Sequence, residues 1–239
     1  MKKISTLLTV VFSLLLLASC NVEPLDPELL TDNGAISGGT SSGDYWPTQI
    51  NNEWTFEQNG VAQSPMKIIS SATIGGALYY QFNTQTVTGS GASATNVTTR
   101  LNKSGGIYNL KTDDLNINAL GLTGMQTGYT MILLKDNIPV GQTWTGNYSQ
   151  STTYTGILAL VTNTTYTGTI LAKNVTETVN GEIFNNVIKM NLRQENNFSG
   201  TITVVNTEYW FAKSVGPIKT LTTSGGANYV SALADYTIY

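Results

Sequence analysis

The sequence contains no histidine and only one cysteine, Cys20. Without histidine, the usual Ser-His-Asp and Cys-His catalytic sets and any His-bearing zinc site are excluded. Without a second cysteine, no disulfide can form within the chain. Charged residues make up only 11% of the sequence and no basic stripe is present. Nucleic acid, whose phosphates need lysine and arginine partners, is therefore not an expected partner.

Residues 1–19 have the order of a secretory signal peptide. Lys2 and Lys3 supply a positive start, an apolar run extends from Leu7 to Leu17, and small residues precede Cys20. The apolar run is too short for a comfortable bilayer span, which takes about 20 residues. We therefore expect this segment to be removed and the rest of the chain to be exported.

The residues around the expected cleavage site indicate a lipid anchor. Leu17-Ala18-Ser19-Cys20 resembles the lipobox of bacterial lipoproteins. The resemblance implies that the Cys20 thiol takes a diacylglycerol and that Cys20 becomes the new N-terminus, so that several acyl chains hold the protein on a membrane. Asn21 resembles the residue found after the cysteine in lipoproteins sorted to the outer membrane. It implies an outer-membrane location, with the periplasmic face and the cell surface both open.

Residues 20–44 predict a lipidated, flexible tether. They are polar and glycine-rich, with few large apolar groups after Leu30, a composition that cannot bury enough apolar surface to pack. Residues 23–30 could form one helical turn. The folded part of the protein is expected to begin at residue 45.

Residues 45–239 predict a single all-β domain. Threonine, tyrosine and valine favour strands, and glycine and asparagine favour the turns between them. Gly75-Gly76 and Asn180-Gly181 each separate two β-type runs, which predicts two hairpins. Residues 111–126 are the weakest part of this pattern and could be a short helix or a loop. The expected fold is an antiparallel β-sandwich or a curved half-barrel.

Three short patterns recur in the same order and suggest an internal duplication. A conserved order with a growing offset is typical of tandem β repeats, here residues 45–126 and 135–239 within one domain. The alternative is coincidence, because a threonine- and glycine-rich composition raises the number of chance matches. The matching segments are 47–55 with 139–145, 73–79 with 178–184, and 103–107 with 213–218.

These motifs also carry a resemblance to a known group of proteins. The first half has Trp46-Pro47, then Asn51-x-x-Trp54-Thr55, then a glycine-centred hairpin ending in Tyr79-Tyr80; the second half has Gly181 to Lys189 and Tyr209 to Lys219. Together they resemble a family of uncharacterised outer-membrane or surface lipoproteins of Bacteroidetes-type bacteria. The resemblance covers most of residues 45–239. It implies a β fold similar to that of lipoprotein carriers and an envelope location, and it implies no activity.

The best candidates for a catalytic or metal site in the sequence are acidic residues. Glu177 and Glu182 bracket a predicted hairpin and could face each other, as the two carboxyls of a glycosidase must. The simpler interpretation is that both point to solvent. Asp113-Asp114 offers oxygen ligands without the spacing of a known calcium loop. We therefore expect no catalytic residue, no metal site and no cofactor, and the protein is not expected to be an enzyme.

Aromatic side chains are the remaining candidates for ligand contact, because tyrosine and tryptophan combine an apolar face with a polar group. The candidate ligand-contacting residues are Trp46, Tyr79, Tyr148 and Trp210. Core packing is the competing interpretation, and the β pattern favours it for Trp54, Tyr80, Trp144 and Trp210.

Three functions are compatible with these observations. The first is a non-enzymatic, membrane-anchored envelope lipoprotein that binds an apolar or amphiphilic ligand. The second is a surface glycan-binding module with exposed aromatic residues as its platform. The third is a structural envelope protein that binds other proteins. An enclosed cavity lined by leucine, isoleucine and valine would favour the first, a flat exposed aromatic row the second, and a packed interior without a pocket the third.

Overall fold

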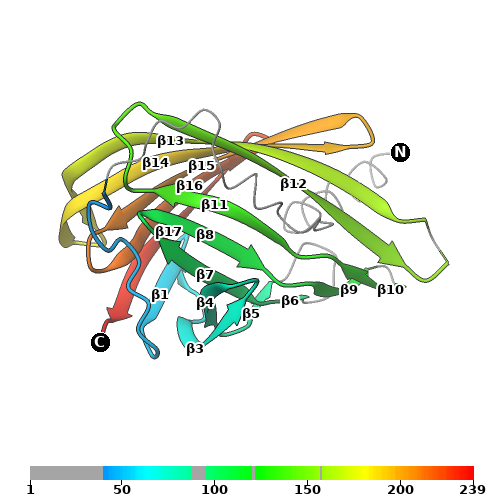
Figure 1. Ribbon diagram of the computed structural model, residues 1–239, viewed down its shortest axis with the longest axis horizontal. Coiled ribbons are helices and arrows are strands. Elements are labelled where there is room, and N and C mark those ends of the chain that lie inside the picture. The colour runs from blue at the N-terminus through cyan, green and yellow to red at the C-terminus, as the bar shows by residue number, and fades with distance from the viewer. Residues whose placement is uncertain (1–39, 88–94, 120–121, 157) are drawn as a thin grey trace.

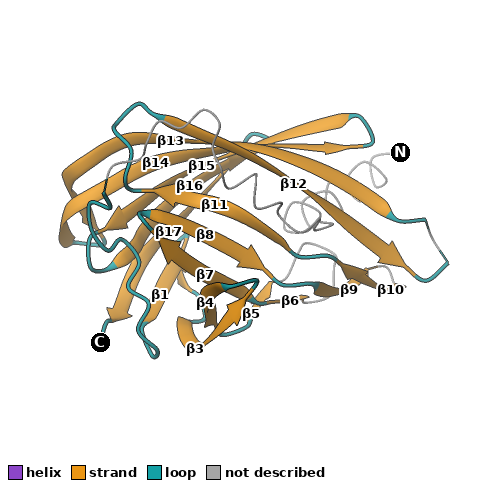
Figure 2. Cartoon of the chain, viewed as in Figure 1, coloured by secondary structure: helices purple, strands orange, loops and turns teal. Residues whose placement is uncertain are grey.

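The computed structural model describes residues 40–87, 95–119, 122–156 and 158–239. Every regular element in these residues is a β-strand (Figure 2), and none of them lies in a helix that could span a bilayer. The predicted all-β fold class is confirmed. The expectation of a helix or loop at residues 111–126 is wrong for the described part, which forms the end of one strand and two further short ones. Residues 1–39, with the signal peptide, Cys20 and the helical turn expected at 23–30, lie outside the described residues.

Seventeen strands lie within these described ranges. The first ten are β1 (Glu53–Gln58), β2 (Val61–Ala62), β3 (Met66–Ile74), β4 (Ala77–Phe82), β5 (Gln85–Val87), β6 (Thr95–Val97), β7 (Thr99–Ser104), β8 (Ile107–Thr112), β9 (Leu115–Ala119) and β10 (Leu122–Gln126). The others are β11 (Tyr129–Lys135), β12 (Thr143–Tyr154), β13 (Leu160–Val179), β14 (Glu182–Phe198), β15 (Thr201–Ala212), β16 (Gly216–Ser224) and β17 (Ala227–Thr237).

Fifteen strands form one antiparallel sheet in the order β11-β8-β7-β4-β3-β1-β17-β16-β15-β14-β13-β12-β10-β9, with β2 added beside β1. Strands β5 and β6 form a separate pair. The long strands β12 to β14 run across the molecule above the shorter strands of the first half (Figure 1). The sheet curls, so that β11 at one end lies against β12 and β13 near the other.

The order of strands has the same plan in both halves of the chain. One run is β1-β3-β4-β7-β8-β11 and the other is β12-β13-β14-β15-β16-β17, and each follows the chain from neighbour to neighbour. The two runs join where β1 pairs with β17. The duplication stays a prediction, and this common plan is the arrangement that it requires.

Tight two-residue turns join many of the neighbouring strands. At Asn180-Gly181 the φ angles are 49° and 84°, the two left-handed conformations of a type I′ turn, whose twist matches that of the strands it joins. The predicted hairpins at Gly75-Gly76 and Asn180-Gly181 are both confirmed. The same pair of positive φ angles occurs at Asn59-Gly60, Gly75-Gly76, Gly105-Gly106, Ser199-Gly200 and Gly225-Gly226.

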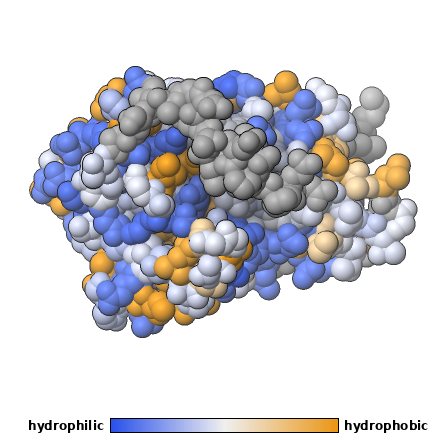
Figure 3. Space-filling model, viewed as in Figure 1, coloured by the Kyte–Doolittle hydropathy of each residue, from blue (hydrophilic) through white to orange (hydrophobic). Residues whose placement is uncertain are grey.

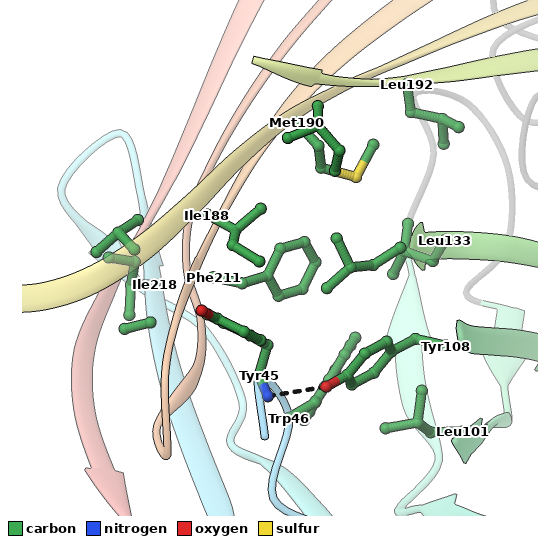
Figure 4. Close-up of a cluster of buried hydrophobic side chains, with 14 of the residues drawn as sticks. Tyr45, Trp46, Leu101, Tyr108, Leu133, Ile188, Met190, Leu192, Phe211 and Ile218 are labelled. Carbon is green, nitrogen blue, oxygen red and sulfur yellow. Dashed lines mark hydrogen bonds between the residues drawn. The ribbon is translucent and has the colours of Figure 1, made fainter. Parts of the chain in front are cut away.

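The core is aromatic where the chain first meets the sheet. Trp46 is 6% exposed, and its ring centroid lies 5.5 Å from that of Phe82 and 5.9 Å from that of Phe211. Tyr45 is fully buried beside it, and its backbone N–H donates to the Tyr108 hydroxyl at 2.9 Å (Figure 4). The segment before β1 therefore fills the interior of the curled sheet.

A buried carboxylate fixes the start of this segment. Asp136 is fully buried and accepts hydrogen bonds from Ser41 Oγ at 2.8 Å, from the Ser42 N–H at 3.0 Å and from the Tyr108 hydroxyl at 3.0 Å. Lys213 Nζ donates to the Ser42 carbonyl at 3.0 Å. Residues 41–44, which the sequence assigned to the tether, thus lie against the folded body.

Two aromatic side chains close the curl. Trp144 Nε1 donates to the Ile132 carbonyl and the Tyr166 hydroxyl accepts from the Ile132 N–H, both at 3.0 Å. Ile132 lies on β11, the end strand of the sheet, whose free backbone groups would otherwise need water. The two rings lie across glycines on the paired strand, Trp144 opposite Gly168 and Tyr166 opposite Gly146. A Cβ at either glycine would overlap the ring beside it.

Gly168→Ala should therefore destabilise the protein by about 1–3 kcal/mol, the usual range for an overpacked core, because the added methyl group pushes the Trp144 indole away from Ile132. Urea unfolding of the variant checks this. Thr165→Ala, at an exposed position of the same strand, is the control and should change the free energy of unfolding by no more than about 0.5 kcal/mol. Equal midpoints for the two variants would contradict the closure described above.

Alkaline pH should unfold the protein through its buried tyrosines. Burial raises the pKa of Tyr209 to about 12 and raises those of Tyr108 and Tyr166 above the ordinary 10.0. A raised folded-state pKa contributes stability that is complete below pH 10 and is lost as the pH rises from 10 toward the folded-state value. Urea midpoints should be level up to about pH 10 and then fall. Tyr239→Phe, at a 66% exposed position, should not alter this profile. Titration of every tyrosine near pH 10 in the folded protein would contradict it.

Candidate functional site

The four aromatic residues proposed from the sequence lie in three different environments. Trp46 is in the core described above. Tyr148 is on the face of β12 that lines the interior, where its ring stacks on Tyr129 at 4.4 Å and its hydroxyl accepts from Gln194 Nε2 at 3.0 Å. Tyr79 on β4 and Trp210 on β15 are both half-buried, and β3, β1, β17 and β16 separate their strands. The structure does not bring the four together.

The side chains on the interior face of β13 change from apolar to polar along the strand. Alternate residues there run from Ile170 and Gly168 through Tyr166 to Thr164 and Thr162, all buried. The apolar end is filled by side chains of the chain itself (Figure 4). At the polar end Thr164 Oγ1 donates to Asn196 Oδ1 at 2.8 Å. A further bond of this kind joins Gln126 Nε2 to Thr152 Oγ1 at 2.7 Å. In this part of the structure the interior polar groups bond to one another.

The acidic residues examined as catalytic or metal candidates each have a structural partner. Glu177 forms an ion pair with Lys189, and Glu182 accepts a hydrogen bond from the Tyr236 hydroxyl at 2.8 Å. In the register of the hairpin, Glu177 lies opposite Phe184 rather than opposite Glu182. Asp113 is held by Arg100 at 2.7 Å and Asp114 by the Gly128 N–H at 2.6 Å. No cluster of metal-binding side chains occurs within the described ranges.

Trp210 lies in a row of side chains that crosses five strands. Directly paired positions place Lys189, Trp210, Lys219, Ala232 and Glu57 side by side on β14, β15, β16, β17 and β1. Paired residues of antiparallel strands project from the same face. This face is opposite to the one that carries Met190 and Phe211, because neighbouring residues of a strand alternate. We call these five residues the outer row.

Two ammonium groups flank the Trp210 ring. Lys189 Nζ lies 3.8 Å and Lys219 Nζ 4.5 Å from the ring centroid, and the indole N–H donates to Glu208 at 2.6 Å. Such cation–π contacts contribute about 0.5–1 kcal/mol each at exposed sites. Lys189 also has Glu177 as a counter-ion. The sequence-based preference for Trp210 as a core residue is met in part: the side chain is half-buried and packs against the core, and two lysine ammonium groups lie over its ring.

A pocket of about 210 Å³ opens beside the outer row. Lys219, Ala232 and Glu57 form its floor, and Val230 lies next to them. Its rim is two hairpin turns that are far apart in the sequence, and we therefore call it the turn pocket. One is Asn59-Gly60 at the end of β1, and the other includes Thr178, Val179 and Asn180 at the end of β13.

The second turn reaches the pocket because the β13–β14 hairpin bends. Asn174 and Asn186 adopt left-handed φ angles of 56° and 54°, one in each strand, where the pairing register shifts. Asparagine tolerates this conformation better than most residues, so both positions can form β-bulges that bend the strands. The tip is then fixed on β17, where Asn180 Nδ2 donates to the Leu233 carbonyl at 3.0 Å.

The turn pocket is lined by two charged side chains, one of each sign. Within the described residues Glu57 and Lys219 take part in no ion pair, whereas six other lysine or arginine contacts with carboxylates occur there. Ala232 lies between Glu57 and Lys219 on the neighbouring strand, and its small side chain leaves the space above it open. Glu57, Lys219 and Ala232 were not among the residues predicted from the sequence, because a cross-strand row appears only when the register of five strands is known.

Exposed apolar side chains among the described residues come from several different strands. On the face drawn in Figure 3, hydrophobic and hydrophilic residues are interspersed. The exposed large apolar side chains come from many strands along the sheet and include Ile69, Leu78, Val161, Ile183, Ile202 and Val230. Single exposed apolar residues of this kind are normal for a protein surface.

Comparison with known proteins gives a likeness of fold. No family model and no curated protein sequence matches the chain. Among solved structures, a predicted lipoprotein from Parabacteroides distasonis is similar with a TM-score of 0.51 at 12% identity, over 82% of this chain and 99% of that one. A predicted exported protein from Bacteroides fragilis, described as having a YmcC-like fold, gives a TM-score of 0.52 at 9% identity over the same shares of the two chains. At these identities the likeness shows a common fold alone.

Replacing Trp210 with alanine should cost about 2 kcal/mol of folding stability. Full burial would make this about 3–5 kcal/mol, but here the Trp210 side chain is only half-buried. The variant should fold, and urea unfolding measures the difference. Trp54→Ala removes a fully buried indole and should cost about 3–5 kcal/mol. An effect of Trp210→Ala as large as that of Trp54→Ala would restore the core interpretation.

Proposed function

We propose that this protein is an exported, membrane-anchored envelope lipoprotein that performs no catalysis and binds the polar end of an amphiphilic ligand in the turn pocket. The observation that carries the proposal is the turn pocket itself, which is lined by Glu57 and Lys219 on either side of the small residue Ala232. Unpaired charges at the edge of a surface pocket provide strong hydrogen-bonding partners for a charged ligand.

The envelope location is supported by two independent observations. The sequence of residues 17–20 is that of a lipobox, and Cys20 is the only cysteine. The similar structures are a predicted lipoprotein and a predicted exported protein. An outer-membrane address follows from Asn21 by the resemblance given above. Anchored there, the turn pocket would meet lipid head groups and envelope glycans at short range.

The absence of catalysis is supported by how the acidic and basic side chains are used. Glu177, Glu182 and Asp113 each hold a structural partner. The turn pocket itself offers a carboxylate and an ammonium group on opposite sides, an arrangement suited to holding a ligand.

A ligand that is wholly apolar has less support. The described part of the interior is filled at its apolar end, and its polar end is hydrogen-bonded internally. The pocket volume of about 210 Å³ is below the roughly 300 Å³ at which sites for whole drug-sized ligands begin. It can hold one head group and not an acyl chain. Val230 at the pocket and Val61 beyond the Asn59-Gly60 turn, 64% exposed, are the apolar contacts near it.

Ala232→Phe tests the proposal, because a large side chain at the floor should fill the turn pocket. The lipidated full-length protein is purified from its envelope in a non-ionic detergent, and bound small molecules are identified by native mass spectrometry. We expect a head-group-bearing ligand on the unchanged protein and none on Ala232→Phe. Ala227→Phe, at an exposed position of the same strand, is the matched control and should keep the ligand. A ligand retained by both variants would place binding elsewhere.

A further inference from the structure

The hairpin of β3 and β4 has one edge that stays unpaired. On the side of β1, the last backbone hydrogen bonds of β3 are those of Ile68, which donates to the Asn52 carbonyl and accepts from the Asn51 N–H, both at 2.9 Å. On its other side β3 remains paired with β4 as far as the turn at Gly75-Gly76. Residues 69–74 therefore have one edge that no strand within the described ranges pairs with.

The register of the hairpin identifies the backbone groups on this free edge. Ile74 and Ala77 flank a two-residue turn and therefore exchange both of their hydrogen bonds. Backbone groups alternate in direction along a strand. The N–H and C=O of Ala72 thus also point to β4, whereas those of Ser71 and Thr73 point away from it. Two donors and two acceptors lie on the free edge of β3.

Other strand edges in the fold are protected by side chains, and this one is not. On β4 the carbonyl of Leu78, which points away from β3, accepts from Asn102 Nδ2 at 2.9 Å. On β11 two aromatic side chains bond the backbone of Ile132. Charged side chains are another common protection of an edge, but the sequence has no charged residue between Lys67 and Arg100. The free edge of β3 therefore has the properties of a strand that pairs with another chain.

We propose that this edge pairs antiparallel with the same edge of a second copy of the chain, across a two-fold axis at Ala72. With the axis there, Ser71 of each copy lies opposite Thr73 of the other, and their outward backbone groups form four hydrogen bonds. The two Ala72 residues then face each other as a non-hydrogen-bonded pair, in which the Cα atoms approach to about 4.5 Å. The pairing would join the two sheets edge to edge.

The side chains of the edge are self-complementary in this register. Ser71, Ala72 and Thr73 are all exposed. A serine and a threonine hydroxyl opposite each other can hydrogen-bond across the strands, and this contact occurs twice by symmetry. Ala72 is small enough for the close approach on the axis. The lack of charge favours a second copy in particular, because identical charges would face each other across a two-fold axis.

The contact is small, so the pairing depends on concentration. The regular stretch of β3 runs only from Ser70 to Ile74, and its edge buries far less than the roughly 1,200 Å² at which stable interfaces begin. Lipid anchors of the kind proposed above would confine the copies to one membrane surface and raise their effective concentration. We therefore expect the dimer in the membrane, and in detergent only at high protein concentration.

Ala72→Cys tests the register in the membrane. Cys20 is the expected site of acylation and the chain has no other cysteine, so the new thiol is the one open to oxidation. Two such thiols on the axis lie within the Cα separation of a disulfide. Mild oxidation of envelope membranes that hold the full-length protein should give a disulfide-linked dimer. Thr73→Cys, off the axis, and Ala227→Cys, exposed on β17, are the controls and should give at least about fivefold less dimer.

A charge at Ala72 tests the identity of the partner. Ala72→Lys places two like charges opposite each other and should weaken self-association of the full-length protein in excess non-ionic detergent about fivefold, as measured by sedimentation equilibrium. Ala72→Glu should do the same, and an equimolar mixture of the two variants should associate at least as well as the unchanged protein. Ala227→Lys is the matched control and should associate like the unchanged protein. Circular dichroism confirms that the variants fold.

Three results would overturn the proposal. Cross-linking of Ala72→Cys to a different protein would exclude the second copy as the partner. Equal cross-linking of Ala72→Cys and Thr73→Cys would exclude the register. A monomer both in oxidised membranes and at the highest concentration in detergent would exclude the pairing itself. None of these results bears on ligand binding, because β3 does not line the turn pocket.

Discussion

Two hydrogen bonds to the backbone of Ile132 join one end of the curled sheet to strands β12 and β13. An open sheet of fifteen strands has two free edges, and an exposed edge invites pairing with other chains. Here Trp144 and Tyr166 reach from the second half of the chain to the backbone of β11 and bond both its N–H and its C=O. The two glycines opposite the rings make this contact sterically possible.

This closure creates the interior into which the N-terminal segment packs. Tyr45 and Trp46 are buried between elements from both halves, and Asp136, which directly follows β11, fixes Ser41 and Ser42. The chain that leads toward the expected lipid anchor is therefore bound to the body of the fold. A force applied through the anchor would act first on the hydrogen bonds between Asp136 and residues Ser41 and Ser42.

Local chemistry made much of the fold predictable. Asn180-Gly181 and Gly75-Gly76 specify their hairpins because few other dipeptides adopt two left-handed conformations in succession. Residues 115–126 were missed as strands because their short, weakly alternating segments gain order only by pairing with each other and with β12. Trp54 and Trp144 were correctly expected in the core. Trp210 meets this expectation only in part, because it is half-buried against the core and its lysine neighbours come from two other strands.

The site could not be predicted for the same physical reason. Glu57, Lys219 and Ala232 are neighbours only through pairings of β1, β16 and β17, and the second rim turn arrives through bulges at Asn174 and Asn186. Neither fact has a signature within any short stretch of sequence. Residues 17–20, which resemble a lipobox, are contiguous in the sequence, so a location can be predicted from them without knowledge of the fold, whereas a ligand site cannot.

A crystal structure of the full-length protein purified from its own envelope would test the central claim most directly. The account predicts electron density for a ligand between Glu57 and Lys219, with Lys219 still against the Trp210 ring. A direct Glu57–Lys219 ion pair across an empty turn pocket, or a ligand bound elsewhere, would contradict it.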